Sequence, residues 1–215
     1  MKTILTQKLT NKMMIAKNRI FFLPIVGLLF CLYSCYFPSY KAVAETSLYD
    51  ISFEEGNWFL NYVSVNGKPA NDFSDYTEKE LASCLKETLY LSYGKRKALY
   101  NVPILTAKNT TESLSLLKAT NTIDYVIQIT GSIGDNEIGG INIKPMKSTE
   151  KSTASIKIEV FEVATQKLLY SQTHSGEIIV ENNREDVLFG KSAQTILRKC
   201  LEKGMKQFKK SGGCR

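Results

Sequence analysis

The chain alternates apolar and polar residues in four stretches, and this period of two predicts β-strands. The stretches cover residues 58–65, 123–133, 154–163 and 168–178. In the third, Ile156, Ile158 and Val160 alternate with polar residues, which predicts one buried and one wetter face. Asn66-Gly67 follows the first stretch directly, and this pair favours a turn with positive φ. The third and fourth stretches predict an antiparallel hairpin.

Apolar residues at spacings of three and four predict three helices. The first begins with a capping box formed by Thr77 and Glu80 and ends at Gly94. Its apolar stripe consists of Leu81, Cys84, Leu85, Leu89 and Tyr93. The second is capped by Asn109 and Glu112 and buries Leu114 and Leu117. The third has the clearest stripe, made of Ala193, Ile196, Leu197, Cys200, Leu201, Met205 and Phe208.

These elements, with a short strand at residues 98–105, predict one domain over residues 50–210. Their order is β-α-β-α-β-β-β-α. This order is typical of an α/β (α+β) fold in which three helices pack on a mixed sheet of about five strands. Residues 131–153 keep no regular period and predict a long mobile loop, and residues 211–215 predict a flexible tail.

The N-terminus has the composition of an export signal. Five basic residues and no acidic residue precede a short apolar run at residues 20–32. The run ends in Leu32-Tyr33-Ser34-Cys35, which resembles the bacterial lipobox, whose cysteine is acylated. We therefore expect residues 1–34 to be a lipoprotein signal peptide, Cys35 to be the lipidation site, and residues 35–49 to be a tether.

Two alternatives to lipidation remain open for this segment. Ala42-Val43-Ala44 is a small-x-small pattern, so signal peptidase cleavage after Ala44 would release a soluble exported domain. An uncut membrane anchor is the third interpretation. It is disfavoured because a membrane span needs about 20 apolar residues, and the run at 20–32 is shorter and contains Pro24.

The net charge of +7 does not indicate nucleic-acid binding. Removing the five basic residues before Cys35 from the total of 28 leaves 23 basic against 21 acidic residues. The remaining positive charge is concentrated in the last helix. Cations near a helix C-terminus complement the helix dipole, and we favour that interpretation over binding to anionic lipid or a partner.

Three cysteines remain after Cys35, namely Cys84, Cys200 and Cys214. Cys84 and Cys200 both fall on apolar helix stripes, so they form either two buried thiols or a Cys84–Cys200 disulfide. We favour buried thiols, because free cysteine is often buried as a small apolar residue. Cys214, in the predicted tail, is then available for an intermolecular bond.

No motif for catalysis, metal binding or cofactor binding is present. His174 is the single histidine, and its place on a predicted strand favours a surface or half-buried residue over a catalytic base. Gly134 and Gly139-Gly140 lack the Lys-Ser/Thr of a phosphate loop. We expect no enzyme activity, no cofactor and no metal.

Two segments resemble a group of bacterial envelope lipoproteins. They are Ile123-Asp124-Tyr125-Val126-Ile127 and the stretch from Val160 to Ser171. The group includes curli-assembly outer-membrane lipoproteins, lipoprotein activators of penicillin-binding proteins, and domains like the amino-terminal domain of the translocation protein of the Tol system. The resemblance covers about residues 50 to 210 at the level of pattern. Gln166 stands where the group has a turn glycine.

The resemblance implies a non-enzymatic domain that binds other proteins or assembles. With the lipobox, it predicts an adaptor or assembly component of the bacterial cell envelope, anchored by lipid to the periplasmic side of the outer membrane. Its expected partners are the membrane and other envelope proteins, and the oligomeric state is left open. The rival hypothesis is the soluble periplasmic binding domain cleaved after Ala44.

Overall fold

The computed structural model describes residues 39–44, 51–93, 99, 105, 110–136, 140–142, 149–181 and 188–214. The predicted signal peptide and Cys35 lie outside the described residues. Most of the strand predicted at residues 98–105 also lies outside the described residues. Within the described part, no helix is long and apolar enough to cross a membrane.

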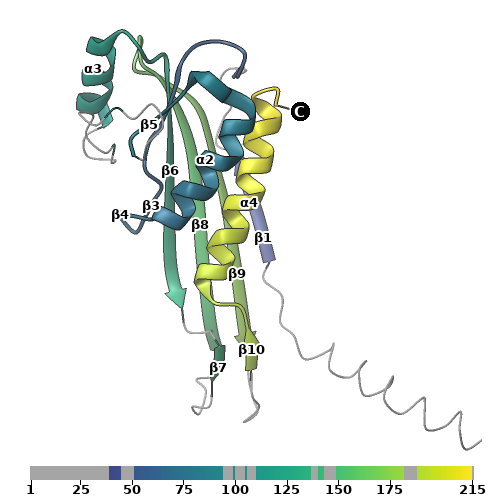
Figure 1. Cartoon of the computed structure of the whole chain (residues 1–215). Helices are drawn as coiled ribbons and strands as arrows, with labels where there is room; N and C mark the ends of the chain where they lie inside the picture. Colours follow the sequence, from purple (N-terminus) through teal and green to yellow (C-terminus); the bar gives the residue numbers. More distant parts are fainter. Residues whose placement is uncertain are drawn as a thin grey trace, which may run out of the picture.

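The main sheet is mixed and has the strand order β1-β9-β8-β6-β2-β5 (Figure 1). Its strands are β1 (Ser39–Ala44), β2 (Trp58–Leu60), β5 (Leu89–Leu91), β6 (Tyr125–Asn136), β8 (Thr149–Glu162) and β9 (Leu168–Glu181). β2 runs parallel to both β5 and β6, whereas the pairs β6–β8, β8–β9 and β9–β1 are antiparallel.

Four short strands lie off this path. β3 (Ser64–Val65) and β4 (Lys68–Pro69) form a small hairpin, and β3 also pairs with β6. The turn between them is the predicted Asn66-Gly67 pair, whose φ angles are 49° and 77°. β7 (Gly140–Asn142) and β10 (Leu188–Gly190) form a separate two-stranded sheet.

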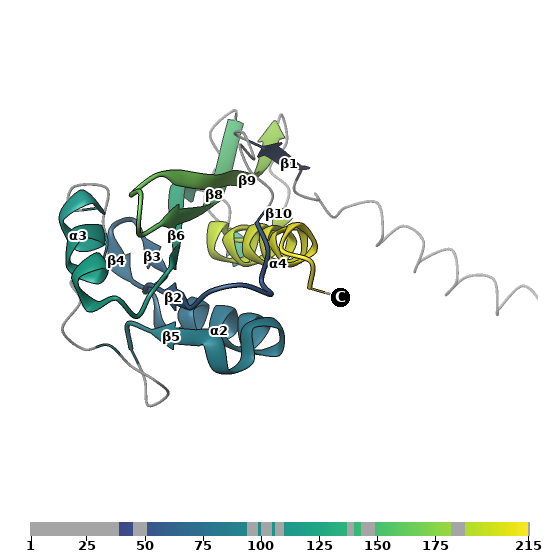
Figure 2. The same cartoon turned by 90° about the horizontal axis from the view of Figure 1, so that it is seen from above.

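Helices cover both faces of the main sheet (Figures 1 and 2). α2 (Asn71–Leu85) and α4 (Ala193–Ser211) lie on one face, and α3 (Thr110–Thr120) packs against the other. β2 shows how the alternation of a strand serves both faces. Trp58 and Leu60 join the large core under α2 and α4, whereas Phe59 joins a smaller cluster with Leu114 and Leu117 of α3.

The predicted fold class is confirmed, although the sheet has more strands than the sequence indicated. The hairpin of β8 and β9 is the predicted one, with each strand longer than expected. α3 and α4 occupy the predicted positions. In α4, the stripe from Ala193 to Phe208 is fully buried against β8 and β9.

The predicted boundaries of the first helix are wrong. α2 begins at Asn71, and Thr77 lies inside it, where its hydroxyl donates to the carbonyl oxygen of Phe73 at 2.8 Å instead of capping the helix. The helix ends at Leu85, and β5 follows. Leu85, Leu89 and Tyr93 are four residues apart, but Leu89, Leu91 and Tyr93 also fit a period of two, and burial beside β2 selects the strand.

The interpretation of residues 131–153 as one long loop is also wrong in part. β6 continues to Asn136, with a register shift between Ile133 and Asn136, and β8 already begins at Thr149. Gly131 breaks the sequence pattern but keeps its backbone pairing, whereas Gly134 falls within the register shift. Gly131 lies opposite Ile156, where an added Cβ would sit 3.1 Å from the Ile156 side chain.

Two segments expected to be flexible are part of the fold. Ser39–Ala44, within the predicted tether, forms β1 and pairs over its full length with residues 172–177 of β9. At the other end, Gly212–Cys214 of the predicted tail is held by backbone hydrogen bonds. Phe53 N–H donates to the carbonyl oxygen of Gly212 at 3.0 Å, and Cys214 N–H donates to that of Lys209 at 2.9 Å.

Candidate functional site: a basic pocket beside the first strand

The structure does not bring Cys84 and Cys200 together. Cys84 forms a disulfide with Cys214, with a Cα–Cα separation of 5.6 Å, and Cys200 is a free, buried thiol. The favoured prediction of two buried thiols therefore holds for Cys200 but is wrong for Cys84, and the alternative Cys84–Cys200 bridge is not formed. Cys214, expected to be available for an intermolecular bond, is paired within the chain. Sequence could not favour this partner, because 130 positions separate the two cysteines.

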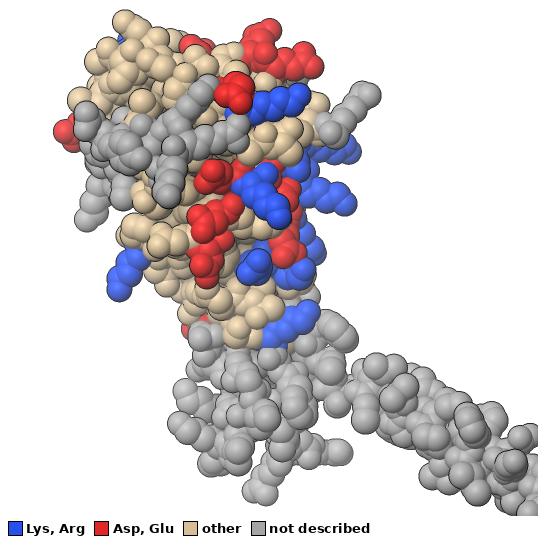
Figure 3. Space-filling view, viewed as in Figure 1, with Lys and Arg blue, Asp and Glu red and all other residues tan. Residues whose placement is uncertain are grey.

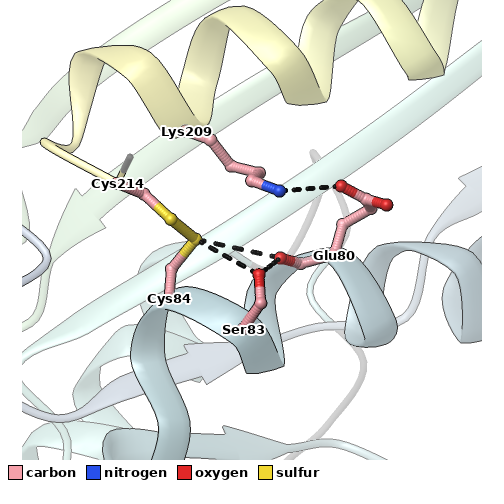
Figure 4. Close-up of polar contacts among 5 residues, drawn as sticks. All are labelled: Glu80, Ser83, Cys84, Lys209 and Cys214. Carbon is pink, nitrogen blue, oxygen red and sulfur yellow. Dashed lines mark hydrogen bonds and ion pairs between the residues drawn. A yellow bond between two sulfur atoms is a disulfide. The ribbon is translucent and has the colours of Figure 1, made fainter.

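The disulfide joins the ends of α2 and α4 (Figure 4). Beside it, Lys209 of α4 and Glu80 of α2 form an ion pair with an Nζ–Oε2 distance of 2.8 Å. The hydroxyl of Ser83 donates to the carbonyl oxygen of Glu80, so this hydrogen bond lies within α2. The C-terminus of α4 is thus fixed to α2 by one covalent and one ionic contact.

A cavity lies between β1, β9 and the C-terminal half of α4. Its volume is about 430 Å³. The side chains that carry charge or hydrogen-bonding groups here come from all three elements. They are Lys41 and Tyr40 of β1, His174 and Ser175 of β9, and Lys203, Lys206, Gln207 and Lys210 of α4. We call this cavity the basic pocket.

His174 forms part of the inner wall of the basic pocket. It is only 5% exposed, and its Nε2 has no hydrogen-bond partner in the described structure. The imidazole ring of His174 fits between β9 and α4 because α4 has Gly204 opposite the ring. A Cβ on Gly204 would lie 3.1 Å from His174 Cδ2. Burial, with a smaller effect from Lys203, holds the pKa of His174 below its ordinary value.

Tyr40 forms the wall on the side of β1. Its ring lies under the Lys203 ammonium, 4.0 Å from the ring centroid, which is a cation–π contact. Its hydroxyl is buried and has no hydrogen-bond partner in the described part of the chain. Burial is the largest of the effects that raise the pKa of Tyr40, so the hydroxyl is a neutral donor near pH 7.

Cys200 lies at the base of the pocket but is not an activated nucleophile. Burial raises the pKa of its thiol to about 11, despite the opposing effect of Lys203. Its Sγ makes a weak contact of 3.9 Å with the carbonyl oxygen of Ala154. Because the thiolate is the reactive form, this cysteine is an inert packing residue near pH 7.

The charged side chains that line the basic pocket are all lysines. Glu202 pairs with Arg198 and Lys199, outside the pocket, whereas Glu177 lies 3.7 Å from the pocket residue Lys41 and partly offsets its charge. Lys and Arg side chains lie mostly toward the right-hand edge of the face in Figure 3, the side on which Figure 1 places α4 and β1. The pocket therefore carries net positive charge.

A second cavity, of about 270 Å³, lies between α2 and α4 and is lined by Asp72, Tyr76 and Arg198 among others. Across the described ranges, no cluster of three or more histidine, cysteine or acidic side chains is placed to hold a metal ion. Glu54 and Glu55 are exposed on a turn before β2.

Sequence reasoning missed the basic pocket because it treated its parts separately. The lysines of α4 were seen as an exposed helix face, His174 as a surface or half-buried residue, and Tyr40 as part of a tether. Only the pairing of Tyr40 with Gly176 across β1 and β9 assembles them. Tyr40 and Lys41 directly precede the Ala42-Val43-Ala44 run. In the structure all five residues are extended and pair with β9.

No model of a known protein family matches the sequence, and no curated protein matches it either. Solved structures with a similar fold exist at low identity. The PelC dodecamer from Paraburkholderia phytofirmans is 9% identical, with a TM-score of 0.38, and the match covers 83% of this chain and 99% of that one. Lipoprotein GNA1162 from Neisseria meningitidis is 15% identical, with a TM-score of 0.36, covering 72% of this chain and 98% of that one.

A third similar structure is a neuraminyllactose-binding hemagglutinin homolog from Helicobacter pylori. It is 12% identical, with a TM-score of 0.38, over 75% of this chain and 84% of that one. These likenesses concern backbone arrangement alone. The function of this chain is therefore argued below from its own residues.

Proposed function

We propose that this protein is a lipid-anchored component of the bacterial cell envelope, attached through Cys35, which acts as a non-enzymatic adaptor or assembly component through protein–protein contacts. The observation that carries the proposal is the position of β1. The strand starts at Ser39, so only Tyr36, Phe37 and Pro38 separate it from Cys35.

β1 favours processing at Cys35 over cleavage after Ala44. Cleavage after Ala44 would remove all six residues of β1, which are paired with residues 172–177 of β9. The cut would also remove Tyr40, which packs against Gly176 and Lys203. Processing at Cys35 leaves the sheet complete.

The disulfide supports a location outside the cytoplasm. Disulfides persist in oxidising compartments such as the bacterial periplasm and are rare in the cytosol. Cys84 and Cys214 are joined in this fold across 130 positions of the chain. This support is independent of the N-terminal sequence.

The non-enzymatic role is supported by the chemistry of the basic pocket. A covalent mechanism needs a nucleophile activated by a base that is oriented by a third group. Cys200 is held as a thiol, and His174 Nε2 contacts no hydrogen-bonding group in the described structure.

Metabolic labelling with palmitate tests the anchor. We expect the wild-type chain to incorporate the label and Cys35→Ala to lose it. Cys31→Ala is the matched control, because it removes a cysteine from the apolar run only four residues away and should keep full labelling. Labelling that survives Cys35→Ala, or none in the wild type, would contradict the proposal.

Site-specific crosslinking in cells tests the adaptor role. Leu116 of α3 and Ile179 of β9 are large apolar side chains that are 44% and 45% exposed. A photoreactive residue at either position should capture a discrete envelope protein, and one at Lys79 on the exposed side of α2 serves as the control. Adducts that are the same at all three positions would count against a specific contact surface.

A further inference from the structure

The basic pocket contains polar groups that the protein itself leaves unpaired. Buried polar atoms in folded proteins nearly always have a hydrogen-bond partner, so each atom without one calls for an explanation such as an ordered water or a bound ion. Here two such groups, His174 Nε2 and Tyr40 Oη, belong to residues of the same cavity. His174 is 95% buried, given its 5% exposure, so it is part of the built interior and not a surface side chain.

The charge of the pocket specifies the sign of the missing group. Lys203, Lys206 and Lys210 approach from α4, and Lys41, which lies 3.7 Å from Glu177, approaches from β1. The described lining itself contains no carboxylate. Lys206 and Lys210 make no ion pair with any described residue, so their charge is not neutralised within that part of the fold. An anion placed here gains charge-assisted hydrogen bonds from several directions.

The type of cation specifies the chemistry of the anion. Arginine forms paired hydrogen bonds with carboxylate and phosphate alike, whereas lysine acts as a compact point charge with three donors. Several lysines that approach from different elements suit an anion with oxygens on several sides, and phosphate has more such oxygens than a planar carboxylate. The basic pocket is lined by lysines and by no arginine among the described residues. We propose that it binds a phosphate group, held by the lysines of α4 with Tyr40 and His174 as hydrogen-bond donors.

The phosphate has two chemical sources, a lipid headgroup or a free phosphate compound. Tyr40 follows Cys35 by five residues, and an extended chain spans at most about 3.6 Å per residue. An acylated Cys35 would therefore keep Tyr40 within about 18 Å of the anchor. The lipid source rests on the proposed function, whereas binding of free phosphate does not.

Lysine acetylation read by mass spectrometry distinguishes these sources. The full chain is purified from membranes in a neutral detergent and titrated with inorganic phosphate against chloride at constant ionic strength. In a second arm it is placed in lipid nanodiscs of phosphatidylglycerol or of phosphatidylcholine. The readout is the acetylation rate of Lys203 and of Lys206 and Lys210, relative to the exposed Lys68 and Lys79 on other elements.

The test variant is Lys206→Gln/Lys210→Gln, and the control with the same charge change is Lys68→Gln/Lys79→Gln. We expect phosphate to protect Lys203 from acetylation, and the protection should saturate as the phosphate concentration rises. The test variant should weaken the phosphate affinity by about tenfold or more, and the control variant should leave it unchanged. Protection by phosphatidylglycerol discs without protection by free phosphate assigns the lipid source. Protection by free phosphate in detergent supports the site even if Cys35 proves unmodified.

Two results would overturn the proposal. One is the absence of protection by either probe. The other is an equal loss of protection in both double variants, which would show general attraction to a basic surface. His174→Leu adds a separate readout: it keeps all four lysines, and we expect it to weaken phosphate protection of Lys203 because leucine cannot donate the hydrogen bond that the imidazole would make.

Discussion

Single residues determine how closely β1, β9 and α4 approach one another. Gly176 of β9 lies opposite Tyr40 of β1 and beneath Ile196 of α4. A Cβ at this position would be 2.5 Å from Ile196 Cγ2 and 2.8 Å from Tyr40 Cδ1, closer than real Cβ contacts. The absence of a side chain therefore lets the helix and the edge strand pack on the same point of β9.

Gly176→Ala should lower the free energy of unfolding by about 1–3 kcal/mol, the usual cost of overpacking a core. Urea unfolding followed by circular dichroism measures it. Ser175→Ala is the matched control, because Ser175 is the neighbouring residue on the opposite face of β9 and is only half-buried. Equal midpoints for the two variants would show that β1 and α4 are not packed on Gly176.

His174 makes stability depend on pH. Its pKa is lowered from 6.5 by burial and by Lys203, while its other polar neighbours in the pocket, Tyr40 and Cys200, have raised pKa values and stay neutral. Below pH 6.5 the unfolded chain binds a proton at His174 more readily than the folded one. This contribution to stability is complete above that pH and is lost as pH falls toward the lowered pKa.

Urea unfolding between about pH 5 and pH 8, where histidine titrates, measures this contribution. The wild type should lose stability on acidification more steeply than His174→Gln, which lacks the titrating group. The carboxylates of the chain are the same in both proteins, so the difference isolates His174. Parallel pH profiles would mean that His174 is accessible to water in the folded state.

At the scale of elements, the disulfide and the ion pair join α2 to α4. Cys84→Ser and Cys214→Ser should each lower the free energy of unfolding by about 2–4 kcal/mol, because the bridge limits the freedom of the unfolded chain. The double variant should cost no more than either single one. Differential scanning calorimetry under oxidising conditions checks this, and unchanged midpoints in both single variants would contradict the pairing.

Periodic elements were predictable from sequence, and boundaries decided by packing were not. The hairpin of β8 and β9 was predicted because its alternating residues match one buried face. The α4 stripe was predicted for the same reason. The end of α2 was misplaced because the spacing of Leu85, Leu89 and Tyr93 fits a helix as well as a helix followed by a strand.

Long-range pairings lay beyond the sequence because no local pattern encodes the partner. β1 meets β9 across more than 120 positions, and Cys84 meets Cys214 across 130. Gln166 is a related case at short range. It adopts a φ of 59° in the turn between β8 and β9, where the resemblance had indicated a glycine, and its amide donates to the Ser115 hydroxyl at 3.0 Å.

At the scale of the molecule, β1 connects the proposed anchor to the basic pocket. A three-residue link from Cys35 to Ser39 leaves little freedom for the domain to move away from a membrane. One acyl chain gives only marginal membrane binding, so two or more chains on Cys35 are needed for stable attachment. The domain would then face its surroundings at a nearly fixed distance from the bilayer.

The mature N-terminus is the most direct test of this account. Mass spectrometry of the trypsin-digested protein from cells should find the peptide Cys35–Lys41 carrying acyl groups, because trypsin cuts after Lys41. This outcome leaves β1 in the domain and links it to lipid. An unmodified mature chain that begins at Glu45 would contradict the account, since it would lack both the anchor and β1.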